Sequence, residues 1–378
     1  MQATICDALK KVKPIDWNRL TGTENPFIRH EFLHALEASQ SVGVDAGWVP
    51  QHLLIHDNGE LVGAVPSYLK SHSYGEYVFD WAWADAYQRH GLRYFPKLVC
   101  TIPFTPAAGP RLLCAPARDS LEFRQKMITA IIDLSNRINL SSVHFLFTNP
   151  TDKQALQENN LLIRMGCQYQ WQNNGFRDFS DFLYSFNSKR RKEIKRERRR
   201  AQESGYDIQI SMAKDVREEQ WDTFYKYYCQ TYDRKWGVPY LTRDFFRILS
   251  QNMADSVCLV TASLNGHLHA GAFCLLGTTT LYGRNWGCSS YQSSLHFEMC
   301  YYQTIEYCIL NGLERFEAGA QGDYKINRGL MPTPTWSAHW IQNREFRNAI
   351  KKFLSEEQLS IERYIAHITN QSPFKSHG

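Results

Sequence analysis

Two sets of turn signals recur in this chain at one fixed separation. Asn58-Gly59 returns as Asn265-Gly266, and Tyr74-Gly75 returns as Tyr282-Gly283, so that both separations are close to 207 residues. Asn-Gly between apolar runs is a strong signal for a two-residue hairpin turn, and a shared spacing indicates two copies of one domain fold. A length of 378 residues also exceeds the size at which a single core keeps growing. We therefore expect two tandem domains.

Strands and helices are expected to alternate in both halves, from the period of their apolar residues. In the first half the pattern predicts helices at 26–39 and 119–138, a hairpin at 51–73, a strand from Tyr74 that leads into an acidic loop, and strands at 101–111 and 142–147. In the second half it predicts strands at 259–263, 269–276, 316–320 and 335–341, and helices at 221–236, 245–253, 294–310 and 343–368. This mixture favours the α+β class, in which each domain is a mixed, mostly antiparallel sheet flanked by helices. We place the domains at 1–175 and 206–378, joined by a basic helical connector at 176–205.

The connector contains a short, strongly basic segment. Nine of the twelve residues from Lys189 to Arg200 are basic and two are acidic, which gives the segment +7 while the whole chain carries +5. Asn187 or Ser188 suits the N-cap of a helix here, and Gly205 suits its end. Three interpretations stay open: a solvated face, a site for a phosphate-bearing ligand such as coenzyme A or tRNA, and attraction to a membrane surface. The candidates for phosphate or nucleic-acid contact are Arg191, Lys195, Arg198 and Arg199.

The cysteines and the N-terminus bear on the compartment. The ten cysteines include no Cys-x-x-Cys pair and most lie in apolar runs, which favours reduced, buried thiols and no zinc site. No apolar signal-peptide core and no run of about 18 apolar residues is visible. The sequence therefore predicts a cytoplasmic protein that has neither a bound metal nor a transmembrane segment.

The chemistry is expected in the Gly-rich stretch from Phe316 to Leu330. Its first residues suit the end of a buried strand, and Glu, Gln, Asp, Lys and Arg then alternate with glycine and other small residues. Ionisable groups in such a turn are costly unless they meet a ligand or one another, and glycine lets a backbone approach a ligand closely. A solvated polar loop is the alternative interpretation of the same pattern.

This motif resembles a known family. The order Glu-Ala-Gly-Ala-Gln-Gly-x-x-Lys-x-x-Arg-Gly over 317–329, followed by Pro332, Thr335, His339 and Trp340, is similar to the FemAB-like N-acyltransferases of the GCN5-related acyltransferase superfamily, proteins of peptidoglycan biosynthesis or recognition. The pieces at 83–87, 171–173 and 179–183 resemble the same family. Many relatives carry His where this chain has Tyr324. The resemblance implies two tandem acyltransferase domains.

An N-acyltransferase joins an amine to an activated acyl or aminoacyl carbonyl. The reaction needs a base for the amine, a donor to the oxyanion and an acid for the leaving group. We assign Glu317 as the base, directly or through a water, because it sits at the inner end of a predicted strand. Gln321 is assigned as the oxyanion donor, and Tyr324 as the acid in place of the His of many relatives. Lys325 and Arg328 would meet anionic groups of the ligands. The alternative for both cations is an internal salt bridge to Asp323 or Glu317.

Further candidates would bind the two substrates. In the superfamily, a strand-to-helix junction meets the pyrophosphate of the donor. Here that junction precedes a helix expected from Ser294, and it lacks the glycine-rich signature of simple acetyltransferases. The expected cofactor contacts are Arg284, Trp286, Gly287, Ser289, Arg328 and Gly329. The expected substrate contacts are Asp80, Trp83, Asp85, Tyr87, Arg89, His296, Glu298, Tyr302 and His339, of which His296 also suits a core histidine.

The donor is expected to be an acyl-CoA, and the acceptor a small-molecule or peptide amine. Fem enzymes of peptidoglycan bridges use aminoacyl-tRNA, but this chain lacks the long helical arm of several tRNA-using relatives and its basic run is short. tRNA stays the alternative partner. A hypothesis of another class is a non-catalytic protein that binds a cell-wall precursor or RNA on a degenerate acyltransferase fold.

Overall fold

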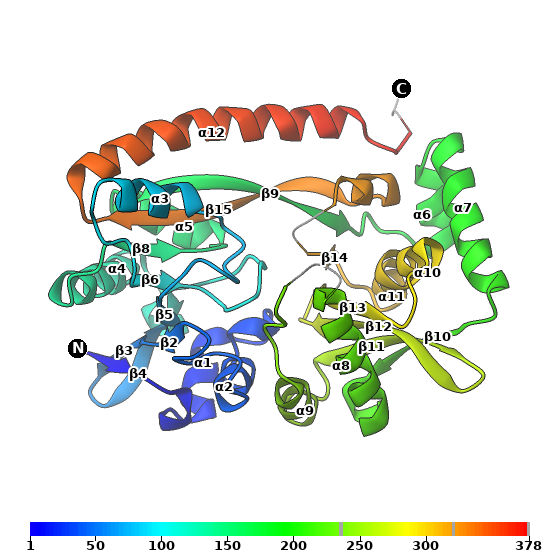
Figure 1. Cartoon of the computed structure of the whole chain (residues 1–378), viewed down its shortest axis with the longest axis horizontal. Helices are drawn as coiled ribbons and strands as arrows, with labels where there is room; N and C mark the ends of the chain where they lie inside the picture. Colours follow the sequence, from blue (N-terminus) through cyan, green and yellow to red (C-terminus); the bar gives the residue numbers. More distant parts are fainter. Residues whose placement is uncertain (234–236, 320–321, 376–378) are drawn as a thin grey trace. The chain divides into compact units, whose positions relative to one another are not determined.

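A computed structural model describes residues 1–233, 237–319 and 322–375 (Figure 1). The chain forms two compact units. Unit 1 comprises residues 1–167 and 334–364, and unit 2 comprises residues 168–333 and 365–378. Gln321, the expected oxyanion donor, lies outside the described residues.

The limits of the units differ from the domain limits expected at 175 and 206. Three elements pass from one unit to the other along the chain: β9 (Leu162–Gln172), β15 (Met331–Ile341) and α12 (Arg344–Asn370). Unit 1 therefore regains a late strand and most of a late helix, and the basic connector belongs to unit 2. Domain limits drawn at single positions of the sequence cannot describe this chain, because residues 334–364 belong to unit 1 again.

The strands of unit 1 form two sheets in the described residues. The first has the order β1-β3-β4-β7 with antiparallel neighbours, from strands Gln2–Cys6, His52–Asp57, Glu60–Val65 and Leu113–Cys114. The second joins β2-β5-β6-β8-β15, where only β6 and β8 are parallel, from strands Trp48–Pro50, Ser67–Lys70, Lys97–Cys100, Ser142–Phe145 and Met331–Ile341.

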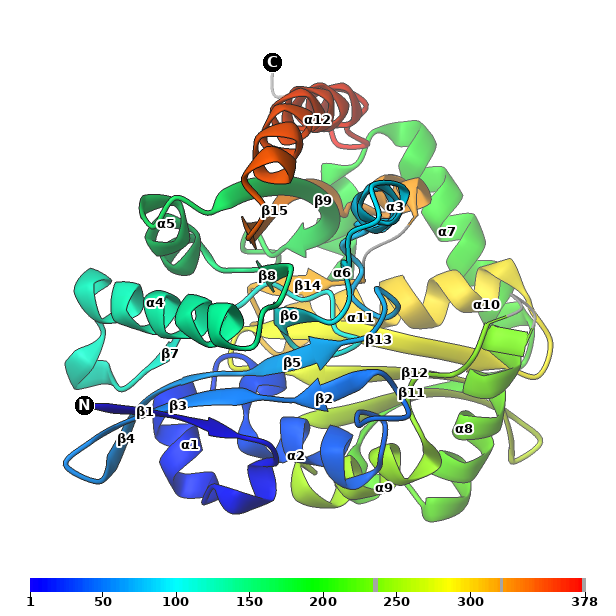
Figure 2. The same cartoon turned by 60° about the vertical axis from the view of Figure 1, so that its left-hand side comes forward.

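Helices cover both sides of these strands. Helix α4 (Leu121–Arg137) lies on one side, and α1 (Pro14–Thr21) and α2 (His30–Ala38) lie on the other (Figure 2). Apolar residues of α4 such as Phe123 and Met127 are buried against strand residues such as Val143 in the main core of the unit. The remaining helical elements of unit 1 are η1 (Leu9–Lys11), η2 (Pro26–Ile28), α3 (Trp81–Arg89), η3 (Pro116–Arg118) and α5 (Pro150–Glu158).

Unit 2 is built on one mixed sheet. Its order is β10-β11-β12-β13-β14 followed by the end of β9, and among the described strands of this unit only β13 and β14 are parallel. The strands span Asp207–Met212, Val257–Leu264, His267–Leu276, Thr280–Cys288 and Arg315–Glu317. The helical elements are α6 (Phe179–Ser185), α7 (Ser188–Glu203), η4 (Ala213–Asp215), α8 (Glu218–Asp233), α9 (Arg243–Asn252), α10 (Ser293–Phe297), the π-helical η5 (Glu298–Tyr302), α11 (Gln303–Leu310) and η6 (Asp323–Arg328).

Both predicted hairpins are present with the expected turns. Asn58 and Gly59 join β3 to β4 with φ of 50° and 82°, and Asn265 and Gly266 join β11 to β12 with φ of 52° and 79°. Positive φ at both central residues is the geometry that Asn-Gly favours in a two-residue hairpin. The second recurrence does not hold in the structure, because Tyr74-Gly75 lies in a loop while Tyr282-Gly283 lies in β13.

Two predictions for the first half were wrong. No strand forms between Ser71 and Asp80 in the described chain, and the alternating aromatic residues after it form helix α3. Its buried face carries Trp83 and Tyr87, four residues apart, which is a helical period. The strand expected at 101–111 is instead β6, which ends at Cys100. Three prolines between 103 and 110 remove backbone donors there, and the segment forms no regular element.

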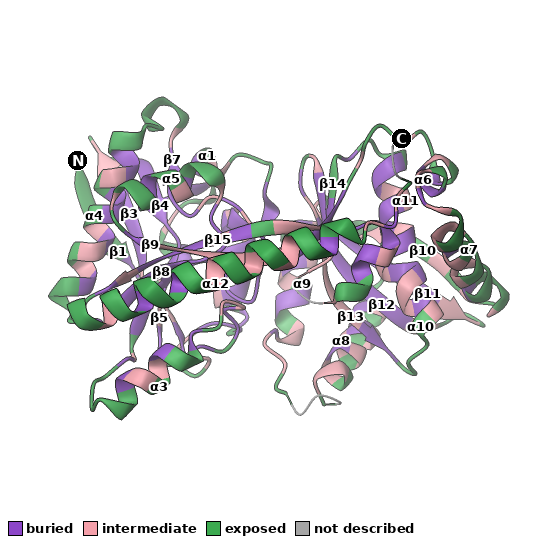
Figure 3. Ribbon diagram, turned by 90° about the horizontal axis from the view of Figure 1, so that it is seen from above, coloured by how far each residue is buried: buried purple, intermediate pink, exposed green. Residues whose placement is uncertain are grey.

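The long helix α12 confirms the predicted charged helix near the end of the chain. Its residues are mostly exposed or half-buried, as the colours of Figure 3 show. In unit 1, Ile350 and Leu354 of this helix join a small buried cluster with Trp83, Tyr87 and Tyr94. Predicted helices at 119–138, 245–253 and 294–310 are also confirmed within about two residues at their ends.

Candidate functional site

The motif of unit 2 begins where two parallel strands part. Strands β13 and β14 pair only over Thr280–Tyr282 and Arg315–Glu317. β14 ends there, whereas β13 continues to Cys288, and no described strand accompanies β13 further on that side. A shift in register against β12 falls in the same part of β13, because Gly283 and Asn285 pair with consecutive residues and Arg284 is left as an extra residue. Such bulges are over-represented next to active sites.

Glu317 is the last residue of β14 and is almost fully buried. Its side chain is 7% exposed, and Gln170 on β9 donates a hydrogen bond of 3.1 Å to its Oε1. Burial raises the pKa of Glu317 to about 7, and Arg315 and Arg284 offset this only in part. A carboxyl group that titrates near neutral pH is suited to take up and release a proton. The catalytic role of Glu317 stays a prediction.

Lys325 closes the loop that follows Glu317. Its Nζ donates to the carbonyl oxygens of Ala318 at 2.7 Å and Gly319 at 2.8 Å. Burial lowers the pKa of Lys325 to about 8. Its recorded partners are backbone carbonyls and not the carboxylates of Asp323 or Glu317. Lys325 therefore has partners inside the protein, as the alternative interpretation expects. These partners are backbone carbonyl oxygens of the loop and not a carboxylate.

Tyr324, the expected acid, lies on the surface of the same short helix. It is 42% exposed, and its hydroxyl accepts a hydrogen bond of 3.3 Å from Tyr301. Gly322 has φ of 110°, and a Cβ there would lie 2.6 Å from the Tyr324 ring. The absence of a side chain at Gly322 therefore leaves room for the Tyr324 ring.

Arg328 is held by a residue that the sequence interpretation did not select. Its Nη2 lies 2.8 and 3.0 Å from the two carboxylate oxygens of Glu197, which belongs to the basic helix α7. Its Nη1 donates to the Tyr324 carbonyl oxygen at 2.9 Å, and its guanidinium stacks on Phe297 at 3.4 Å. The sequence signal for Glu197 was an acidic residue within a basic run. Its partner Arg328 is far away in the sequence, so the pair was not visible.

Two expected cofactor glycines have structural reasons of their own. A Cβ at Gly287 would lie 2.5 Å from the carbonyl carbon of Tyr227, so β13 approaches the backbone of α8 directly. Gly329 has φ of 85°, and a Cβ there would meet the rings of Phe182 and Phe186 at 2.8 and 2.9 Å. Packing therefore accounts for both glycines, and cofactor contact by either residue stays a prediction.

Of the other candidates at the junction after β13, Trp286 and His296 are in ring contact, and Ser289 lies beside His269. Thr231 donates to the carbonyl oxygen of Trp286 at 3.2 Å, and the Trp286 ring meets His296 edge-on at 5.1 Å. Ser289 lies 3.3 Å from His269 Nδ1. The expected helix follows as α10, η5 and α11, and the π-helical part is a feature found often at functional sites.

Glu298 and Tyr302, expected to bind substrate, face α7 from the π-helical segment. Arg198 donates to Glu298 at 3.1 Å and pairs with Glu306 at 2.6 Å, and Gln303 also donates to Glu298. Burial raises the pKa of Glu298, and Arg198 counters it. Tyr302 donates to Glu197. Arg198, a candidate for phosphate contact, is therefore paired with two carboxylates of its own unit.

The predicted helix over the basic segment is confirmed as α7. The side chain of Asn187 accepts a hydrogen bond of 3.0 Å from the backbone of Arg190, which caps the helix. Lys195 is exposed, Arg199 pairs with Glu203 at 3.7 Å, and Arg191 lies 5.7 Å from the Tyr184 ring. These three candidates lie at or near the surface, whereas Arg198 points inward.

Unit 1 holds its own buried cluster of ionisable residues. Lys97 donates to Ser73 at 3.0 Å and to Glu76 at 2.8 Å, and it also pairs with Asp80. Burial raises the pKa of Glu76 to about 7. Burial would also raise the pKa of Asp80, but Lys97 and other neighbours keep it below its usual value. Lys97 and Glu76 were missed by the sequence analysis, because their pairing is formed by the fold.

Two histidines extend this cluster along neighbouring strands. Tyr94 donates to Asp80 at 2.5 Å and lies 3.3 Å from His144 Nε2. His144 and His339 share a hydrogen bond of 2.7 Å between their Nδ1 atoms, and burial lowers the pKa of His144 to about 3. Two neutral imidazoles in complementary tautomers satisfy this bond. The Trp83 ring meets His339 at 5.0 Å.

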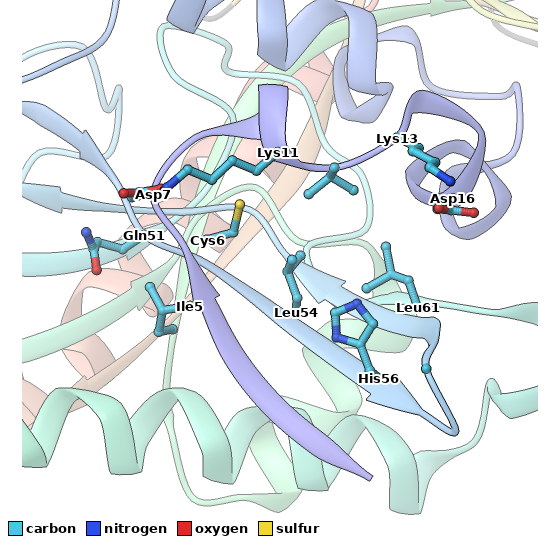
Figure 4. A pocket seen from close by; sticks show the side chains of 12 residues that line it. Ile5, Cys6, Asp7, Lys11, Lys13, Asp16, Gln51, Leu54, His56 and Leu61 are labelled. Carbon is cyan, nitrogen blue, oxygen red and sulfur yellow. The ribbon is translucent and has the colours of Figure 1, made fainter.

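The other candidates of unit 1 have local partners. Asp85 and Arg89 form an exposed ion pair of 2.8 Å on α3, and Tyr87 packs on Phe346 at 4.1 Å. A polar pocket of about 620 Å³ opens beside β1 (Figure 4). In it Lys11 pairs with Asp7 at 2.5 Å, and burial raises the pKa of the Cys6 thiol. Lys11 and Asp7 of this pocket are thus paired with each other.

The family model described as peptidoglycan biosynthesis/recognition, FemAB-like, matches residues 8–376. The chain belongs to the FemAB-like family. This membership confirms the resemblance carried by the motif, and it supports a transferase in a peptidoglycan-related process. Among curated proteins, no sequence matches this chain.

Solved structures share the fold at low sequence identity. A crystal structure of FemX has a TM-score of 0.53 at 10% identity and covers 93% of this chain and 100% of its own. The C-terminal domain of a putative lysylphosphatidylglycerol synthetase from Agrobacterium fabrum gives 0.52 at 8%, covering 89% and 95%. A protein of unknown function from Bacteroides thetaiotaomicron gives 0.52 at 11%, covering 89% and 99%. The α+β fold with two acyltransferase-like domains is thereby confirmed.

Within residues 1–233, 237–319 and 322–375, no group of three or more His, Cys, Asp or Glu side chains is placed to hold a metal ion. Over the same part of the chain, every helix is too short or too polar to span a bilayer.

Proposed function

We propose that this FemAB-like protein is an N-acyltransferase in which Glu317 is the general base. The observation that carries the proposal is the position of Glu317 at the end of β14, where β13 and β14 part and the Gly-rich motif begins. Its raised pKa, about 7, leaves a large fraction ionised at neutral pH. Within the described part of the chain, Gln170 is the one side chain that donates a hydrogen bond to its carboxylate.

The proposed reaction moves an acyl group from a thioester to an amine. Glu317 takes a proton from the acceptor ammonium, directly or through a water. The amine nitrogen then attacks the carbonyl carbon and a C–N bond forms. The nitrogen releases its second proton to solvent as the C–S bond breaks. Tyr324 gives a proton to the departing thiolate, and it regains one from solvent because its ring is exposed. Gln321 of the same motif is assigned as the donor to the developing oxyanion.

The parting of the strands supports acyl-CoA as the donor. The edge of β13 beyond Tyr282 presents backbone to an extended ligand arm, which would bind as an added strand does. Arg284, Trp286 and Ser289 lie along or just after this edge. The acceptor is proposed to be an amine of a peptidoglycan-related molecule, in keeping with the family description.

One observation favours aminoacyl-tRNA as the alternative donor. The outer face of α7 exposes Lys189, Lys192, Lys195, Arg196 and Arg200. A row of cations on one helix suits a polyanion, and binding of this kind weakens steeply with salt. The two donors are chemically parallel, since both present an activated carbonyl to the same amine.

A transfer assay with matched variants tests the proposal. Purified protein is given acyl-CoAs or aminoacyl-tRNAs together with peptidoglycan precursors, and mass spectrometry detects the amide. Glu317→Gln is expected to abolish transfer, while Glu314→Gln, an exposed glutamate beside the same strand, leaves it unchanged. Transfer by Glu317→Gln at the wild-type rate contradicts the assigned base. Precursor binding without transfer from any donor favours the non-catalytic alternative.

A further inference from the structure

The basic helix α7 carries an acidic residue on its inner face that organises the motif. Glu197 accepts hydrogen bonds from Arg328 at 2.8 and 3.0 Å and from the hydroxyl of Tyr302. The side chains of Glu197 and Arg328 are 24% and 6% exposed, so the pair lies largely out of water. One carboxylate therefore joins three elements of unit 2: α7, the π-helical segment and η6.

Arg328 has little freedom while Glu197 is present. Its two terminal nitrogens are used by Glu197 and by the carbonyl of Tyr324, and its flat face lies on Phe297. Its Nε is buried and has no hydrogen-bond partner in the described part of the chain. A buried arginine held in this way depends on its counter-charge, because removal of one partner leaves the other desolvated and unpaired.

The constraint on Arg328 is passed to the loop after Glu317. Arg328 and Lys325 belong to the same short helix η6, whose six residues run from Asp323 to Arg328. Lys325 holds the carbonyl oxygens of Ala318 and Gly319, the two residues that follow Glu317. A continuous set of contacts thus leads from Glu197 through Arg328 and Lys325 to the backbone beside Glu317.

We propose that Glu197 is a positioning residue of the motif: through Arg328 it sets the place of η6, and thereby keeps Lys325 on the loop beside Glu317. The effect on rate rests on the proposed function. The effect on the position of Lys325 does not, and it is measurable in a protein without any substrate. The basic helix is accordingly part of the motif's support, whatever its outer face binds.

The pH dependence of Lys325 acetylation distinguishes positioning from simple electrostatics. Trace acetic anhydride labels the neutral amine, and peptide mass spectrometry gives the titration midpoint. If Glu197→Gln releases η6, Lys325 gains water and the midpoint rises from about 8 by roughly one pH unit. If η6 stays in place, the unpaired charge of Arg328 adds to the local positive field and the midpoint falls. The buried thiol of Cys300 counters the effect of burial on the pKa of Lys325, and this thiol is unchanged in both cases.

Matched variants complete the test. Glu193→Gln removes an acid of the same helix that pairs with Arg190 near the surface, so the Lys325 midpoint is expected to stay at the wild-type value. Glu197→Asp retains the negative charge, and its Lys325 midpoint is expected to lie between the values of the wild type and of Glu197→Gln. Tyr302→Phe removes one hydrogen bond to Glu197 and keeps the ring, and it is expected to raise the midpoint by a smaller amount. It carries the test if Glu197→Gln does not fold.

Kinetics separate this inference from the proposed function. Where transfer is measurable, Glu197→Gln is expected to lower kcat about tenfold or more with a smaller change in KM, because the loop is misplaced and the substrates still bind. If the Lys325 midpoint rises in a protein that transfers no acyl group, the positioning role of Glu197 is supported and the proposed transferase activity is contradicted. An unchanged or lowered midpoint in both Glu197→Gln and Tyr302→Phe overturns the positioning role.

Discussion

Replacing Glu317 by glutamine is expected to stabilise the protein in neutral and basic solution. The carboxyl group has its pKa raised from 4.5 to about 7 by burial. In the unfolded chain the group ionises near 4.5, so between these two values the folded state binds more protons and stability falls as the pH rises. At about 1.36 kcal/mol per pKa unit, the loss above pH 7 amounts to about 3 kcal/mol. Below pH 4.5 the group contributes nothing, because it is protonated in both states.

Denaturant unfolding at about pH 4.5 and about pH 8 measures this difference. Glu317→Gln cannot ionise, so it is expected to match wild type at the lower pH and to exceed it by up to about 3 kcal/mol at the higher pH. Glu314→Gln serves as the control and is expected to change little at either value, because Glu314 is exposed. A difference between Glu317→Gln and wild type that is the same at both pH values refutes the reasoning, since it would mean that burial does not penalise the ionised carboxylate.

Three further perturbations test other parts of the structure. Gly287→Ala is expected to lower the melting temperature, because its Cβ would lie 2.5 Å from the backbone of α8, while Gly237→Ala meets nothing closer than 3.4 Å and serves as its control. Lys97→Met leaves Glu76 and Asp80 buried without their cation and is expected to cost about 3–5 kcal/mol in denaturant unfolding, against little for Lys126→Met in an exposed pair. Replacement of Lys192, Lys195 and Arg196 on the outer face of α7 by neutral residues is expected to leave acyl-CoA transfer unchanged. If tRNA binds, the same replacement is expected to reduce the salt dependence of its affinity in a titration series.

Local signals in the sequence predicted the parts of the fold that local chemistry decides. Both Asn-Gly turns are hairpins because two residues with positive φ are needed there and these two residue types adopt it most readily. Helices with a clear apolar period, such as α4, were located to within about two residues. The segment from Tyr74 to Arg111 was misassigned, since its aromatic residues and prolines fit several local structures and their burial depends on distant strands.

The sequence indicated some residues of the candidate site and missed others. Glu317 was found because a charged residue at the end of an apolar strand, followed by glycines, is visible in the sequence alone. Glu197 was not, because its partner Arg328 is joined to it only by the fold. Gly287 and Gly329 were taken for ligand contacts, yet each stands where a neighbouring backbone or ring leaves no room for a side chain. A glycine signals close approach, and the sequence does not say what approaches.

The protein contains two buried glutamates whose pKa is raised to about 7, and their partners decide which one suits catalysis. Glu76 in unit 1 pairs with Lys97 at 2.8 Å, so taking up a proton there would break an ion pair that is closed to solvent. Glu317 in unit 2 has a neutral amide as its recorded hydrogen-bond donor and stands at the end of a strand beside a glycine-rich loop. Its proton can be exchanged without separating charges. A similar pKa therefore accompanies two different settings, a buried ion cluster in one unit and the proposed general base in the other.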